Sequence, residues 1–118
     1  MSLIKICLAM EEAEARASAK ARALIRTYQN QFKSMVYTVH PKGIIGEVRG
    51  KASNIAWACK DLLKGCSVSD VVTIMDVDTC FAQDYFQAVS CHYAAANSEN
   101  RLFMMFAPTT LFDRFIFD

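Results

Sequence analysis

The segment that most constrains the fold is Val71 to Met75, an uncharged and mostly β-branched run that ends in the acidic triplet Asp76-Val77-Asp78. Such a run predicts a buried strand of a parallel sheet. Side chains two residues apart on a strand point to the same side, so the carboxylates of Asp76 and Asp78 are expected to project together from the strand's carboxyl end. In open α/β sheets, ligands bind just beyond this end.

Two neighbouring carboxylates repel each other unless a cation lies between them. Mg²⁺ and Mn²⁺ suit this position, because hard cations take oxygen ligands and share them with a diphosphate. We therefore expect Asp78, together with Asp76, to bind one of these two metals. The alternative is that Asp78 caps the next helix and that Asp76 is a solvated strand end.

Patterns typical of strands and helices alternate along the chain, as they do in α/β proteins. Strands are expected over Leu3 to Ala9, Met35 to His40, Val71 to Met75 and Leu102 to Ala107. Helices are expected over Glu11 to Phe32, Ala52 to Leu63 and Gln83 to Ala96. Apolar residues recur at helical spacing in the first helix, at Ala17, Ala21, Leu24, Ile25 and Tyr28. A length of 118 residues, 53% of them hydrophobic, allows one domain with a core.

The stretch from Lys42 to Gly50 contains three glycines and is expected to form a loop that can approach a ligand closely. It leads into the helix that begins near Lys51. Backbone N–H groups and the positive end of the helix dipole favour a phosphate at such a junction, and the Lys51 ammonium adds a full charge. The alternative is a solvated lysine, followed by an asparagine, Asn54, that caps or packs locally.

Two motifs in this chain resemble those of the family-2 nucleotide-sugar glycosyltransferases. The stretch from Val72 to Phe86 is similar to the family's Asp-x-Asp segment. The stretch from Arg49 to Ala58 is similar to the family's helix start, in which a Gly-Lys pair, here Gly50-Lys51, is followed by an asparagine, here Asn54. The two motifs occur in the family's order. The resemblance covers roughly Leu3 to Arg114, which is the middle of a catalytic domain.

The resemblance implies a partial GT-A fold, a Rossmann-like three-layer sandwich around a mostly parallel sheet of about four strands. It implies that Lys51, Asn54 and Asp76 bind the nucleotide, and that Asp78 and Asp76 hold Mn²⁺ or Mg²⁺. The implied parent reaction is inverting transfer of a hexose from a nucleotide-sugar donor to a glycan or another hydroxyl acceptor. The metal would stabilise the departing nucleoside diphosphate.

The resemblance also implies that parts of the family's domain are missing. The family's first strand, which holds the nucleobase, has no counterpart before Leu3, and neither Asp113 nor Asp118 has the motif context of the family's catalytic base. We therefore expect residues 1–118 to be a single partial domain, an internal fragment or a degenerate relative, that binds donor without turnover and whose catalytic base is unknown. The missing strand is expected to leave sheet edges through which copies self-associate.

Two other interpretations stay open. One is a non-catalytic α/β module that binds a nucleotide or a partner protein. The other is a response-regulator-like domain, whose acidic strand ends also bind Mg²⁺. The chain lacks the lysine that such a domain needs at the end of a later strand, so the first of the two is the stronger alternative.

Composition argues against several other classes of protein. A formal net charge of +1, with basic residues scattered along the chain, gives no patch for nucleic acid. Five cysteines without a Cys-x-x-Cys pair do not indicate a zinc site and are expected to be reduced thiols. No segment reaches the roughly 20 apolar residues of a membrane span, although full-length members of the resembled family are often membrane proteins. The expected location is the cytoplasm or the cytosolic face of a membrane.

Overall fold

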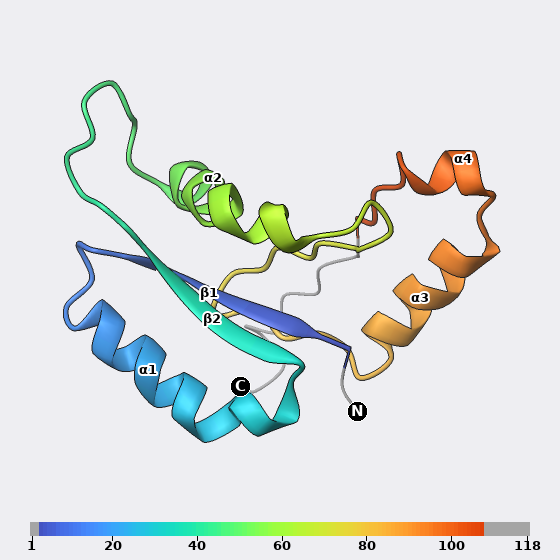
Figure 1. The fold of residues 1–118 in the computed structure, drawn as a ribbon, viewed down its shortest axis with the longest axis horizontal. Helices are drawn as coiled ribbons and strands as arrows, with labels where there is room; N and C mark the ends of the chain where they lie inside the picture. The colour runs from blue at the N-terminus through green and yellow to red at the C-terminus, as the bar shows by residue number, and fades with distance from the viewer. Residues whose placement is uncertain (1–2, 108–118) are drawn as a thin grey trace, which may run out of the picture. The chain divides into compact units, whose positions relative to one another are not determined.

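The computed structural model describes residues 3–107 and divides the chain into two compact units, residues 1–66 and 67–118. The first unit contains, in order, β1 (Lys5–Glu11), α1 (Ala17–Tyr28), a 3₁₀ turn (Gln29–Gln31), β2 (Ser34–His40), α2 (Lys51–Leu62) and a second 3₁₀ turn (Leu63–Gly65) (Figure 1). The second unit contains α3 (Tyr85–Ala95) and α4 (Ser98–Arg101). Among the described residues, no helix is long and apolar enough to cross a bilayer.

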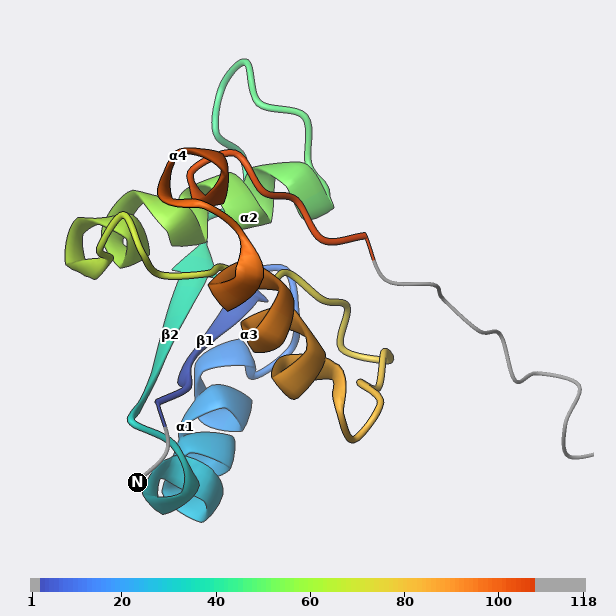
Figure 2. The ribbon, with the colours of Figure 1, turned by 90° about the vertical axis from the view of Figure 1, so that its right-hand side faces the viewer.

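β1 and β2 form a parallel sheet in which Lys5 pairs with Ser34 and Glu11 pairs with His40. A parallel pair needs a crossover connection, which α1 supplies. α1 packs on one face of this sheet and α2 on the other, so the first unit has three layers (Figure 1, Figure 2). The α/β class predicted from the sequence is therefore confirmed, with two parallel strands.

α1 begins later than its sequence pattern suggested. β1 extends to Glu11, and the turn that follows contains Arg16, whose backbone is left-handed with φ of 60°. The apolar stripe of α1 is confirmed where the helix begins, because Ala17 and Ala21 are 6% and 0% exposed. Further along, Leu24 remains 43% exposed. The helix thus lies against the sheet through its small residues.

The buried apolar residues of the described chain are all alanines, at positions 17, 21 and 58. His40, at the end of β2, is buried with them at 6% exposure. No large side chain within residues 3–107 is fully buried. Small side chains let helix and sheet backbones approach closely. The packing of the first unit therefore relies on close contacts of these alanines rather than on large interlocking side chains.

Two of the four predicted strands are not formed, and these two predictions are wrong. Val71–Met75 and Leu102–Ala107 lie in turn or irregular backbone, and Val72 and Ile74 are 55% and 56% exposed. An apolar, β-branched pattern favours burial, but a strand also needs a neighbour that takes up its backbone N–H and C=O groups. Pro108, which was expected to end the fourth strand, lies outside the described residues.

The predicted helix over Gln83 to Ala96 is confirmed as α3. An aromatic cluster lies at its start: the rings of Phe81 and Tyr85 stack with centroids 4.4 Å apart, and Phe86 meets Phe81 edge-on at 5.0 Å. Such ring pairs stabilise a contact beyond the apolar area that they bury. The cluster fixes the turn that leads into α3.

Candidate phosphate-facing edge and acidic turn

The predicted loop between β2 and α2 is confirmed, and its backbone adopts conformations that favour glycine. Gly43 and Gly46 have φ of 79° and 81°, a left-handed region that favours glycine. The loop ends at Gly50, the N-cap residue of α2, and no side chain caps the helix there. Lys51, the first residue of α2, is exposed at this same end.

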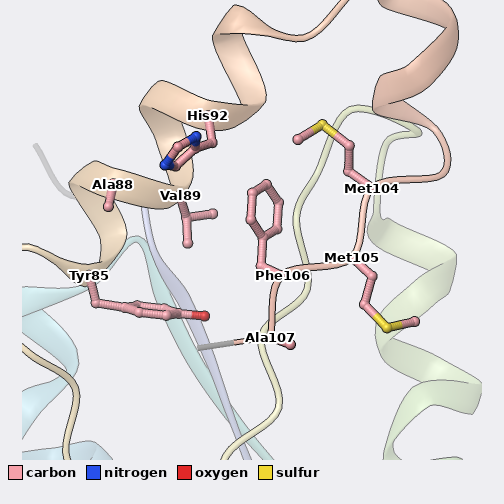
Figure 3. Close-up of a pocket in the computed structure, with 8 residues that line it drawn as sticks. All are labelled: Tyr85, Ala88, Val89, His92, Met104, Met105, Phe106 and Ala107. Atoms are coloured by element: carbon pink, nitrogen blue, oxygen red, sulfur yellow. The ribbon is translucent and has the colours of Figure 1, made fainter. Parts of the chain in front are cut away.

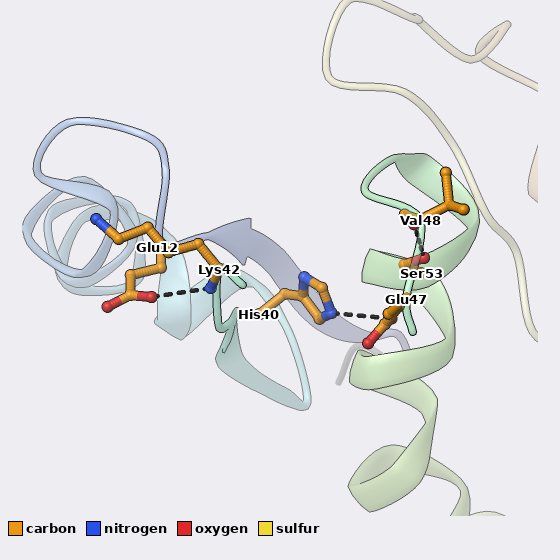
Figure 4. Close-up of polar contacts among 6 residues, drawn as sticks. All are labelled: Glu12, His40, Lys42, Glu47, Val48 and Ser53. Carbon is orange, nitrogen blue, oxygen red and sulfur yellow. Dashed lines mark hydrogen bonds and ion pairs between the residues drawn. The ribbon is translucent and has the colours of Figure 1, made fainter. Parts of the chain in front are cut away.

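Two contacts hold the loop against the carboxyl end of the sheet (Figure 4). The backbone N–H of Lys42 donates to Oε2 of Glu12 over 2.9 Å. Nε2 of His40 lies 3.1 Å from Oε1 of Glu47, with side-chain exposures of 6% and 29%. Because water reaches the His40 ring poorly, the contact with Glu47 satisfies a polar group that would otherwise be buried without a partner.

α2 covers this end of β2 through an aromatic contact. The ring of Trp57 meets the His40 ring edge-on, with centroids 5.5 Å apart, and Nζ of Lys60 lies 4.5 Å from the centre of the Trp57 ring. A cation over an indole ring is attracted to the negative face of the ring. The contact therefore packs the middle of α2 against the end of β2.

Asn54 connects the first turns of α2 to β1. Its Nδ2 donates to the backbone carbonyl of Ala9 over 2.9 Å, while its Oδ1 is buried and has no hydrogen-bond partner among the described residues. The hydroxyl of Ser53 donates to the carbonyl of Val48 (Figure 4). Sequence patterns predicted a nucleotide role or a local cap for Asn54, and gave no sign of this contact with a residue 45 positions away.

Replacing Glu47 with alanine is expected to lower the free energy of unfolding by about 1–3 kcal/mol, because the buried ring of His40 loses its hydrogen-bond partner. Urea titration at pH 7 measures the change. Glu14 is the matched control, since it forms an exposed pair with Lys20 at 2.6 Å. Glu14→Ala is expected to change the stability by less than about 1 kcal/mol. Equal effects of the two substitutions would contradict the structural role of Glu47.

Asp76 and Asp78 belong to the second unit and lie in an exposed turn. The backbone N–H of Thr79 donates to the carbonyl of Asp76 over 3.1 Å, and Val77 is fully exposed. The expectation that a strand projects the two carboxylates to one side is wrong, because a turn has no two-residue periodicity. Within residues 3–107, no three His, Cys, Asp or Glu side chains gather closely enough to hold a metal.

The five cysteines are all unpaired. Cys66, Cys80 and Cys91 are exposed, while Cys7 on β1 and Cys59 on α2 are partly buried. Burial raises the pKa of the Cys7 thiol, a nearby contact with Thr38 works in the opposite direction, and Cys59 adds to the rise. Cys7 is therefore a weaker nucleophile than an ordinary thiol at neutral pH.

The second unit contains a hollow of about 430 Å³ between α3 and the segment that follows α4 (Figure 3). Four residues of α3 and four of the later segment line it: Tyr85, Ala88, Val89, His92, Met104, Met105, Phe106 and Ala107. Met105 is 92% exposed, so the wall on that side is formed by a side chain in solvent. None of the site residues predicted from the sequence lines this hollow.

Comparison of the chain with protein-family models, curated proteins and solved structures finds no match.

Proposed function

We propose that this chain is the donor-binding part of a family-2-like glycosyltransferase, binding a nucleoside diphosphate at the Gly50–Lys51 edge. The observation that carries the proposal is the start of α2. The helix begins at the carboxyl end of a parallel strand pair, its N-cap is a glycine without a side-chain cap, and its first residue is a lysine. Helix N-termini of this kind accept phosphate through backbone N–H groups and the helix dipole.

The contacts of Asn54 and Arg49 also support phosphate binding at the Gly50–Lys51 edge. The Asn54 amide fixes the first turns of α2 relative to Ala9, and Nη2 of Arg49 lies 3.8 Å from Oε2 of Glu11. The side chain of Arg49 is 62% exposed, so a phosphate can compete for it. A bidentate guanidinium beside a lysine is a common way to hold a diphosphate.

The acidic turn supplies the second part of the proposal. Mg²⁺ is commonly bound by one or two carboxylates together with phosphate oxygens, a ligand set that Asp78 and Asp76 fit without a third protein ligand. The parent reaction that the family resemblance implies would use such a metal to stabilise the departing nucleoside diphosphate. We assign no catalytic base: Asp113 and Asp118 lie outside the described residues, and binding without turnover is expected.

Calorimetry with uridine and guanosine diphosphates, with and without Mn²⁺, tests the proposal. Loss of one charge-assisted contact is expected to weaken metal-dependent binding about tenfold or more in Asp78→Ala and in Lys51→Ala. Asp61→Ala is the control, since that carboxylate is exposed and pairs with Lys64 at 2.7 Å. Binding that is the same in Asp78→Ala and in Asp61→Ala would remove the metal role from Asp78.

The alternative function is a non-catalytic α/β module that binds a nucleotide or a partner. The irregular backbone around the acidic turn favours it, because no strand holds Asp76 and Asp78 in a fixed relation. In that case Lys51→Ala would weaken nucleotide binding, Asp78→Ala would not, and added Mn²⁺ would have no effect. The same titrations therefore separate the two functions.

A further inference from the structure

Two of the five cysteines lie inside the first unit, on elements that pack against each other. Cys7 is on β1 and Cys59 is on α2, and both thiols are free and partly buried. β1 and α2 are in direct contact within this unit. The other three cysteines, Cys66, Cys80 and Cys91, are exposed.

The face of β1 that carries Cys7 is the face that α2 covers. Side chains two residues apart on a strand point to the same face, so Cys7, Ala9 and Glu11 share one face. Glu11 pairs in register with His40, whose side chain lies on that face too. The His40 ring meets the ring of Trp57 on α2 edge-on, with centroids 5.5 Å apart. The side chain of Cys7 is therefore directed toward α2.

Cys7 and Cys59 also lie at the same level along the sheet. α2 runs in the opposite direction to β1 (Figure 1), and Nδ2 of Asn54 lies 2.9 Å from the Ala9 carbonyl. Going back along β1 from Ala9 to Cys7 covers about 7 Å, at about 3.3 Å per residue. Going forward along α2 from Asn54 to Cys59 covers about 7.5 Å, at about 1.5 Å per residue.

The electrostatic environment of Cys7 supports this proximity. Burial is the main cause of the raised pKa of the Cys7 thiol, a contact with Thr38 acts against the rise, and Cys59 adds to it. One thiolate disfavours a second negative charge mainly over a short distance. The two thiols are therefore neighbours beneath α2.

We propose that Cys7 and Cys59 form a disulfide between β1 and α2 when the chain is exposed to a low-molecular-weight disulfide such as oxidised glutathione. The Cys59 thiolate attacks one sulfur of oxidised glutathione, which forms a mixed disulfide and releases one glutathione thiolate. The sulfur of Cys7 then attacks the sulfur of Cys59 and displaces the second glutathione. Both thiol protons end on glutathione, so one disulfide is reduced and one is formed.

The order of the two attacks follows from the environment of Cys7. A raised pKa leaves little Cys7 thiolate at neutral pH, so Cys7 reacts slowly with a disulfide in solution. Its attack on the mixed disulfide at Cys59 is intramolecular, and the high effective concentration offsets the small thiolate fraction.

The disulfide fixes α2 on the sheet. The described contacts between α2 and β1 include the single amide bond from Asn54 to Ala9, and the buried apolar residue of α2 is the small Ala58. A cross-link from Cys7 to Cys59 closes a long loop and restricts the unfolded chain. The oxidised chain is therefore expected to be the more stable form, and reduction reverses the change. This switch does not depend on nucleotide binding.

A background variant in which Cys66, Cys80 and Cys91 are replaced by serine tests the proposal without the exposed thiols. Native protein treated with oxidised glutathione is expected to yield one cross-linked peptide pair, joining Cys7 to Cys59, by mass spectrometry. Its thermal unfolding midpoint is expected to rise by about 5 °C or more and to return after reduction with dithiothreitol. Thiols that stay free, or that each keep a bound glutathione, would overturn the proposal. A cross-link without a higher midpoint would overturn the fixing of α2.

Two further variants of this background separate proximity from reactivity. Cys7→Ser is expected to stop at the mixed disulfide, with one glutathione bound at Cys59; a variant that takes up none would overturn the order of attack. The matched control moves the thiol by one position, combining Cys59→Ser with Lys60→Cys. Lys60 is exposed and lies about 100° further around the helix, so no cross-link to Cys7 is expected. Equal cross-linking from positions 59 and 60 would mean that Cys59 is not directed toward Cys7.

Discussion

Asn54→Asp is expected to lower the free energy of unfolding at pH 7 by about 3 kcal/mol, because a carboxylate oxygen would face the carbonyl oxygen of Ala9 in place of the Nδ2 donor. When the introduced carboxyl is protonated it can donate to this carbonyl, so its pKa is raised in the folded protein. The loss is therefore complete above the raised pKa and disappears below the ordinary aspartate value of about 3.9. Urea titrations at several pH values measure the difference from the wild type.

Asn97→Asp is the matched control for this change. The side chain of Asn97 accepts from the backbone N–H of Asn100 over 2.8 Å and caps α4. An aspartate keeps the acceptor and suits a helix N-terminus, so the stability is expected to be unchanged or slightly higher. If both substitutions had the same effect, the Asn54–Ala9 contact would have no special role in joining α2 to β1.

Ala21→Leu is expected to lower the free energy of unfolding by about 2 kcal/mol, because Ala21 is completely buried where α1 lies on the sheet. A larger side chain at this contact must push the helix away from the sheet or adopt a strained rotamer. Thermal and chemical unfolding followed by circular dichroism both measure the loss.

Ala19→Leu is the control, since Ala19 is exposed on the same helix. Alanine and leucine have similar helix propensities, so this change is expected to stay within about 0.5 kcal/mol of the wild type. An Ala21→Leu variant as stable as Ala19→Leu would mean that α1 does not pack on the sheet as closely as the structure indicates.

The sequence alone determined the elements whose signals are local. Helical periodicity predicted α3 to within two residues of its bounds, and the glycines between His40 and Lys51 predicted the loop whose turns need left-handed backbone. The β-branched run from Met35 to His40 predicted β2, with Pro41 ending it. In each case the deciding interactions lie within a few residues along the chain.

Tertiary structure alone decided which apolar runs became strands. Ser34–His40 and Val71–Met75 have similar composition, yet the first pairs with β1 and the second is irregular. Pairing depends on a neighbouring strand edge, which no pattern within five residues can specify. Asp76 and Asp78 were expected to project together from the end of a strand over Val71 to Met75. Because this strand is not formed, the two carboxylates are not aligned in that way.

The sequence also did not predict the contacts around the Gly50–Lys51 edge. Asn54 contacts Ala9, and His40 contacts both Glu47 and Trp57. These contacts form because α1 connects β1 to β2 in parallel and α2 packs on the sheet that results. The sequence identified the chemical groups that suit a phosphate and a metal. The tertiary structure decided which of them are held in place, because a side chain's position depends on packing between elements far apart in the chain.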